Sequence, residues 1–365
     1  METFYRMALG MVPGIGNKLF KSLISYCESA EQVFKAPHSF LKKVPGVGER
    51  LVAEIAKKAT FALAEKELEK AAKLNIQLLF YMDEQYPFRL KQIYDAPSLL
   101  YFKGKTDLNT IKTIGIVGTR QASGYGFQMT NELVRELRRY SNILMVSGLA
   151  YGIDIHAHKA CLDYQIPTVG VMANGVDSVY PYVHKEIAQR MLETGGLLSE
   201  NRIGSLPDAP KFPERNRVIA GMCDAIIVVE AAKKGGALIT AELANSYNRE
   251  VFAVPGNLTQ PYSLGCNYLI KTHKAHLIQS VDDLDYIMNW DLDAKPPELL
   301  VPVHLSEKEK TIIQCLKEKE LLIDELSFKT QIPMNKLASL LLTMEFEGYV
   351  QALPGKKFAL GKKLQ

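Results

Sequence analysis

The chain has 365 residues, of which 47% are hydrophobic and 23% charged, and this composition is typical of two or three globular domains. Its net charge of +4 is too small to require a nucleic-acid partner, so any basic site must be local. With no CxxC pair, the cysteines predict neither disulfides nor a zinc site; they are Cys27, Cys161, Cys223, Cys266 and Cys315. We predict no metal and no cofactor.

The N-terminus lacks a basic segment followed by an apolar one, so it does not resemble a secretion signal. No apolar run approaches the roughly 18 residues that a membrane span needs. We therefore expect a cytoplasmic protein that does not contact membranes.

Residues 1–68 have a helical pattern that contains two similar turns, VPGIG at 12–16 and VPGVG at 44–48. Helical patterns follow them at 17–26 and 49–64. The arrangement resembles a helix-hairpin-helix or SAM-like domain, in which glycines let backbone N–H groups at a helix N-terminus meet a phosphate. Because the flanking charges are mixed, a purely structural helical hairpin explains the pattern equally well.

Residues 69–290 alternate short apolar strands with helices, which predicts an α/β fold with an extended Rossmann-like parallel sheet. Ligands of such sheets bind beyond the carboxyl ends of the strands, so the loops after the strands are where a site is expected. The strands are predicted at 76–81, 113–118, 142–147, 168–173, 197–199, 225–230 and 250–254, and helices at 125–140, 153–164, 184–194 and 237–247.

A Pro-rich and acidic linker is predicted at 291–302, followed by a third domain at 303–365. Ser306 and Glu309 have the spacing of a capping box that opens a helix. Further helices fit 323–329 and 333–347, and a hairpin fits the remainder, so the block is similar to a winged helix. The exposed face of its third helix is only weakly basic, which makes sequence reading by that helix doubtful.

The segment VGTRQASGYG at 117–126 follows a predicted strand but matches neither GxGxxG nor a P-loop. Ser147 and Gly148 end the next strand, where a dinucleotide site would need an acidic residue. The better interpretation is a site for a different phosphate. Arg120 could fork onto the phosphate, Ser123 could cap the next helix with its hydroxyl facing the anion, and Gly118 and Thr119 complete the turn.

Other loops on the same rim carry matching groups, and several anion-binding loops with aromatics between them suit a single nucleic-acid strand. The alternative interpretation is that each loop, considered alone, is an ordinary surface segment with solvated lysines. Asp154 is interpreted separately, as a helix residue paired with His158. The further candidates are Arg215, Asn216, Arg217, Lys233, Lys234, Gly235, Gly236, Thr240, Tyr182 and Lys185.

Motifs in a fixed order from Tyr86-Pro87 to His276 carry a family resemblance. They include IVGTRQASGYG (116–126), SGLAYGIDIHAH (147–158), GVDSVYP (175–181), LLSE (197–200), FPERNRVIAG (212–221), GGALITAELA (235–244) and FAVPGN (252–257). Together they resemble the DNA-processing protein A family, called DprA or Smf.

The resemblance implies a non-enzymatic homodimer that binds single-stranded DNA through its Rossmann-like domain. It also implies that the protein protects incoming DNA and helps to load the RecA recombinase in natural transformation. Three departures from the family pattern stand out. Tyr151 replaces an arginine, residues 233–237 (KKGGA) replace a Ser-Gly-Ser turn, and residues 272–275 (THKA) replace a Gly-Ala near the expected dimer surface.

The rival hypothesis is a Rossmann-like nucleotide hydrolase of the lysine-decarboxylase-like (phosphoribohydrolase) type. Residues 235–242 (GGALITAE) resemble the Gly-Gly-x-Gly-Thr-x-x-Glu turn of that family only distantly. Leu238 stands where the third glycine belongs, and the spacing from Thr240 to Glu242 is shorter. The enzyme is therefore the weaker hypothesis.

Overall fold

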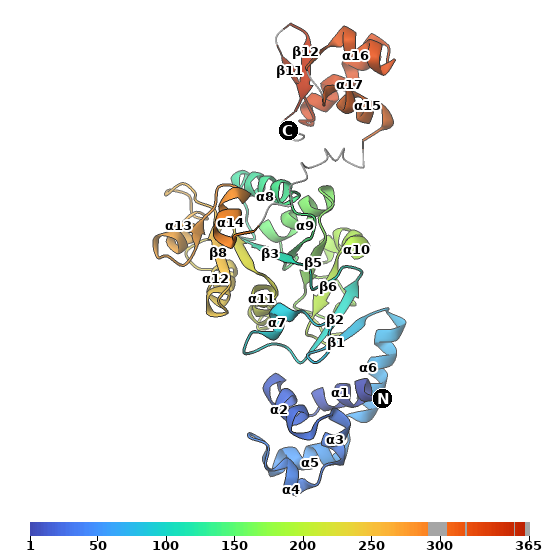
Figure 1. Ribbon diagram of the computed structural model, residues 1–365, viewed down its shortest axis with the longest axis vertical. Helices are drawn as coiled ribbons and strands as arrows, with labels where there is room; N and C mark the ends of the chain where they lie inside the picture. The colour runs from blue at the N-terminus through green and yellow to red at the C-terminus, as the bar shows by residue number, and fades with distance from the viewer. Residues whose placement is uncertain (291–304, 318–319, 354, 362–365) are drawn as a thin grey trace. The chain divides into compact units, whose positions relative to one another are not determined.

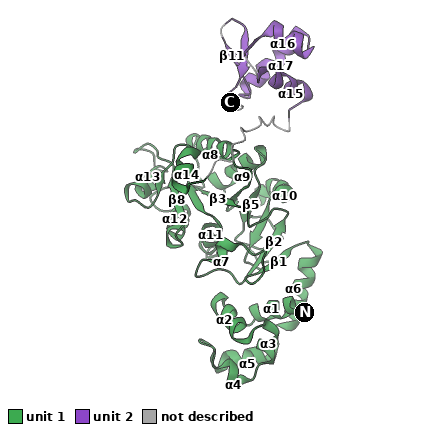
Figure 2. Cartoon of the chain, in the orientation of Figure 1, with its two compact units in different colours: residues 1–294 green, residues 295–365 purple. Residues whose placement is uncertain are grey.

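The computed structural model describes residues 1–290, 305–317, 320–353 and 355–361. The chain divides into two compact units, residues 1–294 and 295–365 (Figure 2). The candidate site predicted from the sequence lies entirely in the first unit.

A nine-stranded sheet forms the centre of the first unit, in the order β1-β2-β6-β5-β4-β3-β7-β8-β9 (Figure 1). The strands from β6 to β9 in this order run parallel, whereas β2 and β1 pair antiparallel at one edge. The strands are β1 Gln77–Phe80, β2 Leu99–Gly104, β3 Lys112–Val117, β4 Ile143–Ser147, β5 Thr168–Val171, β6 Gly196–Ser199, β7 Ala225–Val228, β8 Glu250–Ala253 and β9 His276–Leu277.

Helices cover both faces of this sheet, as β7 shows. Ile226 and Val228 belong to one hydrophobic core, whereas Ile227 faces the other. The first core includes side chains from α11 (Lys211–Met222) and α12 (Gly236–Ser246), and the second from α8 (Gly124–Leu137), α9 (Ile153–Asp163) and α14 (Val281–Met288). Further helices are α7 (Phe88–Lys91), α10 (Lys185–Thr194) and α13 (Leu264–Lys271).

The predicted extended Rossmann-like sheet is confirmed, but the sequence interpretation missed β2 and β9. β2 lies next to Pro97 and pairs antiparallel, so it has no place in a strand–helix alternation. β9 has two residues at the sheet edge, and both of its side chains are exposed. β2 is followed directly by β3 with no helix between them, and β9, although it lies between two helices, is too short to show an apolar run.

The N-terminal region is helical, as predicted, and consists of α1 (Glu2–Gly10), α2 (Asn17–Cys27), α3 (Ala30–Lys35), α4 (His38–Leu41), α5 (Glu49–Lys57) and α6 (Phe61–Lys73). One helix was expected at 49–64. The chain instead ends α5 at Lys58, whose φ of 51° is left-handed. The expected boundary after residue 68 falls inside α6. Buried side chains of this region share one hydrophobic cluster with Phe80 and Tyr101 of the sheet.

The second unit contains α15 (Glu307–Leu316), β10 (Leu321–Leu322), α16 (Ile323–Thr330), α17 (Met334–Phe346), β11 (Val350–Leu353) and β12 (Lys357–Leu360). Three helices with a three-stranded sheet, in the order β10-β12-β11, make the predicted winged helix. Ser306 and Glu309 form the predicted capping box. The linker expected at 291–302 lies outside the described residues. None of the helices in the described ranges is long and apolar enough to cross a membrane.

Glu67 of α6 joins the N-terminal helices to the sheet. Its side chain is buried and accepts a 2.9 Å hydrogen bond from the backbone N–H of Ile203. We expect Glu67→Ala to lower the free energy of unfolding by about 1–3 kcal/mol, because it leaves a buried donor unsatisfied. Urea unfolding followed by circular dichroism measures this effect. Glu69→Ala, which removes an exposed carboxylate from the same helix, serves as the control and should change little.

Candidate nucleic-acid interface

A pocket of about 380 Å³ opens at the carboxyl ends of β3 and β7. Connections from the two strands run to opposite sides of the sheet here, which is where doubly wound sheets bind ligands. The pocket brings together nine of the residues predicted from sequence: Gly118, Thr119, Arg120, Arg215, Asn216, Lys234, Gly235, Gly236 and Thr240.

Arg120 is an exposed cation of the pocket. It lies just past β3, and its guanidinium carbon is 5.4 Å from the centre of the Phe212 ring. Within the described residues no carboxylate pairs with it. The guanidinium is therefore held by a ring face, and its N–H donors remain available to a phosphate.

The N-terminus of α12 forms the opposite wall. Gly235 and Gly236 line the pocket, and no side chain caps the helix. Its first backbone N–H groups therefore face the cavity with the positive end of the helix dipole. Lys234 is exposed beside them, while the hydroxyl of Thr240 is buried and donates to the Gly236 carbonyl oxygen. Thr240 thus supports the turn.

Arg215 lines the pocket, but its guanidinium is already hydrogen-bonded within the protein. Its side chain is buried and donates to the carbonyl oxygen of Gly148 at 2.5 Å and to that of Val171. The buried carboxylate of Asp154 balances its charge. Burial lowers the pKa of Arg215 to about 10, and Asp154 opposes this shift. Arg215 is therefore placed to position loops and not to bind phosphate through a free guanidinium.

Asp154 was missed as part of the site. Its carboxylate accepts backbone N–H groups of Gly118, Gly148 and Ala150, from loops that follow β3 and β4. Burial raises the pKa of this carboxyl group, and Arg215 and the N–H donors counteract the rise. The predicted pairing of Asp154 with His158 is wrong. The ring of His158 bonds through Nδ1 to the Thr168 hydroxyl at 2.7 Å.

The loop between β4 and α9 passes very close to the turn after β3. Gly152 has φ 78°, and a Cβ there would lie 2.1 Å from the carbonyl oxygen of Thr119. Only glycine satisfies both constraints. Leu149, with φ 55°, is held in the same loop by a 2.9 Å contact between its carbonyl oxygen and Nδ1 of His184. The loop is thus fixed from several sides before any ligand arrives.

Ser123 caps α8 as predicted, since its hydroxyl accepts the N–H of Gly126 at 3.2 Å. The anion that it faces is the chain's own Glu230. The carboxylate of Glu230 accepts the Ser123 hydroxyl at 2.6 Å and the Ser123 N–H at 2.9 Å. Ser123 does not line the pocket, and its hydroxyl and N–H are already engaged within the protein.

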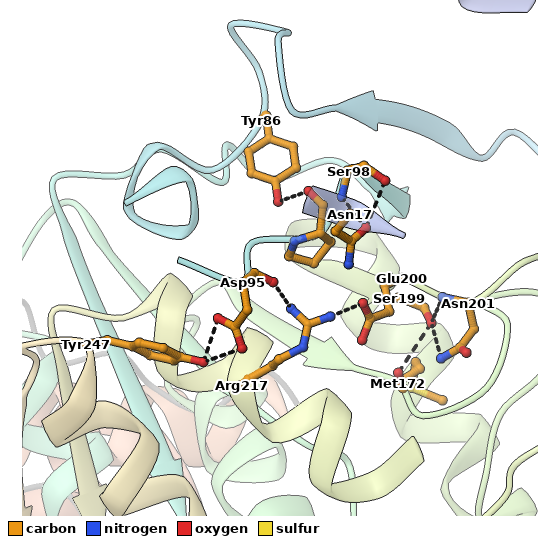
Figure 3. A network of polar contacts seen from close by, with 11 residues as sticks. Asn17, Tyr86, Asp95, Ser98, Met172, Ser199, Glu200, Asn201, Arg217 and Tyr247 are labelled. Carbon is orange, nitrogen blue, oxygen red and sulfur yellow. Dashed lines mark hydrogen bonds and ion pairs between the residues drawn. The ribbon is translucent and has the colours of Figure 1, made fainter. Parts of the chain in front are cut away.

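Arg217 does not line the pocket, and its guanidinium belongs to a separate polar network (Figure 3). Its guanidinium donates to the Asp95 carbonyl oxygen at 2.7 Å and pairs with Glu200. The Asp95 carboxylate in turn accepts the hydroxyl of Tyr247 at 2.8 Å. Because Arg215 and Arg217 are two residues apart on one helix, they face different directions. The structure therefore does not bring Arg217 to the predicted site.

Lys233, Tyr182 and Lys185 are exposed and do not line the pocket either. Tyr182 and Lys185 contact each other instead, with the ammonium 5.3 Å from the ring centre. A smaller hollow of about 30 Å³ adjoins the pocket through Arg120 and Arg215.

Aromatic side chains surround this smaller hollow. Tyr151 and Tyr180 line it together with Phe212, whose ring centre is 5.9 Å from that of Tyr180. Tyr151 and Tyr180 are about half exposed, at 51% and 47%. The available signal for Phe212 was its position in the sequence, three residues before Arg215 in the segment FPERNR.

Comparisons with known proteins agree with this geometry. The family model of DNA recombination-mediator protein A matches residues 77–289, and that of the DprA winged helix domain matches residues 294–356. The chain belongs to the DNA recombination-mediator protein A (DprA/Smf) family. The resemblance read from the motifs is thereby confirmed.

Relatives and solved structures cover most of the chain. Protein Smf of Synechocystis is 31% identical over 98% of both chains. The DNA processing protein DprA of Bacillus subtilis is 44% identical over 55% of this chain and 67% of its own. The DprA structure from Streptococcus pneumoniae covers 80% of this chain and 99% of its own, with a TM-score of 0.68 and 30% identity.

A second solved structure is that of DNA processing protein A from Helicobacter pylori, described for its single-stranded DNA binding mode. It covers 59% of this chain and 94% of its own, with a TM-score of 0.51 and 29% identity. Among the residues that the structure describes, no group of three or more His, Cys, Asp or Glu side chains could hold a metal ion.

We predict that Asp154→Asn lowers the free energy of unfolding by about 1–3 kcal/mol, because it removes the charged acceptor of three backbone N–H groups and the negative charge that offsets the buried Arg215. Thermal and urea unfolding measure this loss. Asp163→Asn changes an exposed carboxylate at the other end of α9 and should cost less than about 0.5 kcal/mol. Equal stability of the two variants would contradict the role given to Asp154.

Arg217→Ala should destabilise the chain without weakening ligand binding at the pocket. Its loss removes the partner of Glu200, whose pKa is already raised by burial and would rise further. We expect a lower melting temperature but an affinity for single-stranded DNA within about twofold of wild type. A larger loss of affinity, with the fold intact, would place Arg217 at the interface after all.

Proposed function

We propose that the chain binds single-stranded DNA at the pocket between β3 and β7 and acts as a recombination mediator. The observation that carries the proposal is that one cavity is lined both by Arg120, whose guanidinium contacts a ring face, and by the uncapped N-terminus of α12. Both are phosphate-binding groups, and neither is neutralised by a nearby acid among the described residues.

The aromatic rings beside the cavity favour a single strand over a duplex. Unpaired bases can stack on Tyr151, Tyr180 or Phe212, whereas the bases of a duplex are already stacked on each other. The solved Helicobacter pylori relative, described by its single-stranded DNA binding mode, supports the same ligand class. We propose direct contacts from Arg120, Lys234, Asn216 and the N–H groups of Gly235 and Gly236.

The mediator role follows from family membership. In this proposal the bound strand is protected and then passed to the RecA recombinase during natural transformation, and the chain acts as a cytoplasmic homodimer. No chemical step on DNA is proposed. The pocket instead offers binding groups on fixed loops.

The nucleotide-hydrolase alternative needs Glu242 at the pocket. Glu242 lies on the exposed side of α12, where it pairs with Lys274 at 2.9 Å. Of the described residues that line the cavity, Asp154 alone carries a carboxylate, and this carboxylate already accepts backbone N–H groups. This geometry provides no free acid to activate water.

The test is fluorescence anisotropy of labelled oligo-dT, compared with a duplex, over a range of salt concentrations. Arg120→Ala should weaken binding to oligo-dT by about 1.5–3 kcal/mol, the range for charged hydrogen bonds. It should also reduce the slope of log affinity against log salt by about 0.7 for each lost phosphate contact. Wild type should prefer the single strand.

Arg190→Ala is the matched control, because Arg190 is an exposed arginine of the same unit that does not line the pocket. It should leave both affinity and salt slope close to wild type. If Arg120→Ala and Arg190→Ala bind alike, the DNA site lies elsewhere on the chain.

A further inference from the structure

Glu230 occupies the N-terminus of α8, the end of the first helix after the central strand β3. Its side chain is only 4% exposed, and both carboxylate oxygens bond to Ser123, at 2.6 Å to the hydroxyl and 2.9 Å to the N–H. Helix N-termini at this point of Rossmann-type sheets commonly hold a phosphate. Here the negative charge comes from the chain itself.

The carboxylate also fills the space that a phosphate would need. A Cβ added to Gly126 would lie 2.2 Å from Oε2 of Glu230, so the carboxylate is in close contact with the first turn of α8. The backbone of Glu230 also holds the loop between β3 and α8, because its carbonyl oxygen accepts the Thr119 N–H at 2.7 Å. An external anion cannot enter without displacing Glu230.

The N-terminus of α12 is different. No side chain caps it, and its first residues, Gly235 and Gly236, line the cavity that also holds Arg120. Two helix ends therefore lie near one rim of the sheet. One is filled by an internal carboxylate, and the other is open.

We propose that Glu230 is a specificity-determining residue, a built-in anion that excludes the phosphates of free nucleotides and dinucleotides from the turn between β3 and α8. A ligand is then restricted to the open end of α12 and to Arg120. The identity of the remaining ligand as DNA rests on the proposed function. The exclusion of phosphate by Glu230 does not depend on it. Glu230 acts by occupying a position, and it needs no contact with the bound strand.

The test is anion rescue of Glu230→Ala. Acetate resembles the removed CH₂–COO⁻ group, and inorganic phosphate resembles the excluded ligand. Melting temperatures are measured in sodium chloride, sodium acetate and sodium phosphate at equal ionic strength. In chloride the variant should melt below wild type. In acetate or phosphate it should gain about 2 °C or more beyond any gain of wild type, with a saturable dependence on anion concentration.

Two further variants sharpen the measurement. Glu230→Gln keeps the size of the side chain, so it should melt below wild type but show no anion rescue. Glu132→Ala removes a carboxylate farther along α8 and should respond to the anions as wild type does. Absence of rescue in a folded Glu230→Ala overturns the proposal. A Glu230→Gln variant as stable as wild type also overturns it, even if Glu230→Ala fails to fold.

Anisotropy with oligo-dT separates this inference from the function on which it partly rests. Wild-type binding to oligo-dT without anion rescue in Glu230→Ala would reject the role of Glu230 alone. Anion rescue with no binding of oligo-dT by wild type would reject the DNA ligand alone.

Discussion

The candidate site depends on two buried groups of opposite charge, Asp154 and Arg215, which bond to the backbone of the strand-end loops. The pair binds the backbone of three strand-end segments, because Asp154 accepts N–H groups after β3 and β4 while Arg215 donates to carbonyl oxygens after β4 and at the end of β5. Charges buried this deeply are stable only when paired and fully hydrogen-bonded. Here the bonds of Asp154 and Arg215 hold the loops after β3 and β4 in place, and the exposed Arg120 and the open end of α12 line the same cavity beside them.

The sequence predicts the fold well, because its signals are local and repeated. Short apolar strands between helical patterns indicate the parallel sheet, and the alternation of Ile226 and Ile227 between two cores shows why β7 had to be continuously apolar. The antiparallel strand β2, which lies beside the edge strand β1, lacks that context, and β9 has only two residues and so shows no apolar run. The break at Lys58 was missed for another reason: a left-handed residue that is not glycine leaves no mark in the helical pattern.

The sequence predicts which segments form the site better than it predicts which of their side chains face the cavity. Loop positions followed from the strand ends, and nine expected residues do share the cavity. What each charge pairs with depends on distant segments. Arg217 pairs with Glu200, which follows β6, and Ser123 bonds to Glu230, which follows β7. A sequence pattern shows that cations cluster, but it cannot show which of them are already neutralised. Arg120 and Lys234 have no carboxylate partner among the described residues, and the binding account therefore rests on them.

The most direct measurement is a crystal structure of the chain with a short oligo-dT. The account predicts a phosphate within hydrogen-bonding distance of the Gly236 N–H and of the Arg120 guanidinium, with a base against Phe212, Tyr180 or Tyr151. Arg215 should keep its bonds to the Gly148 and Val171 carbonyl oxygens, and Glu230 should keep its bonds to Ser123. An oligonucleotide bound with no contact to this cavity, or a phosphate held by a displaced Arg215, would contradict it.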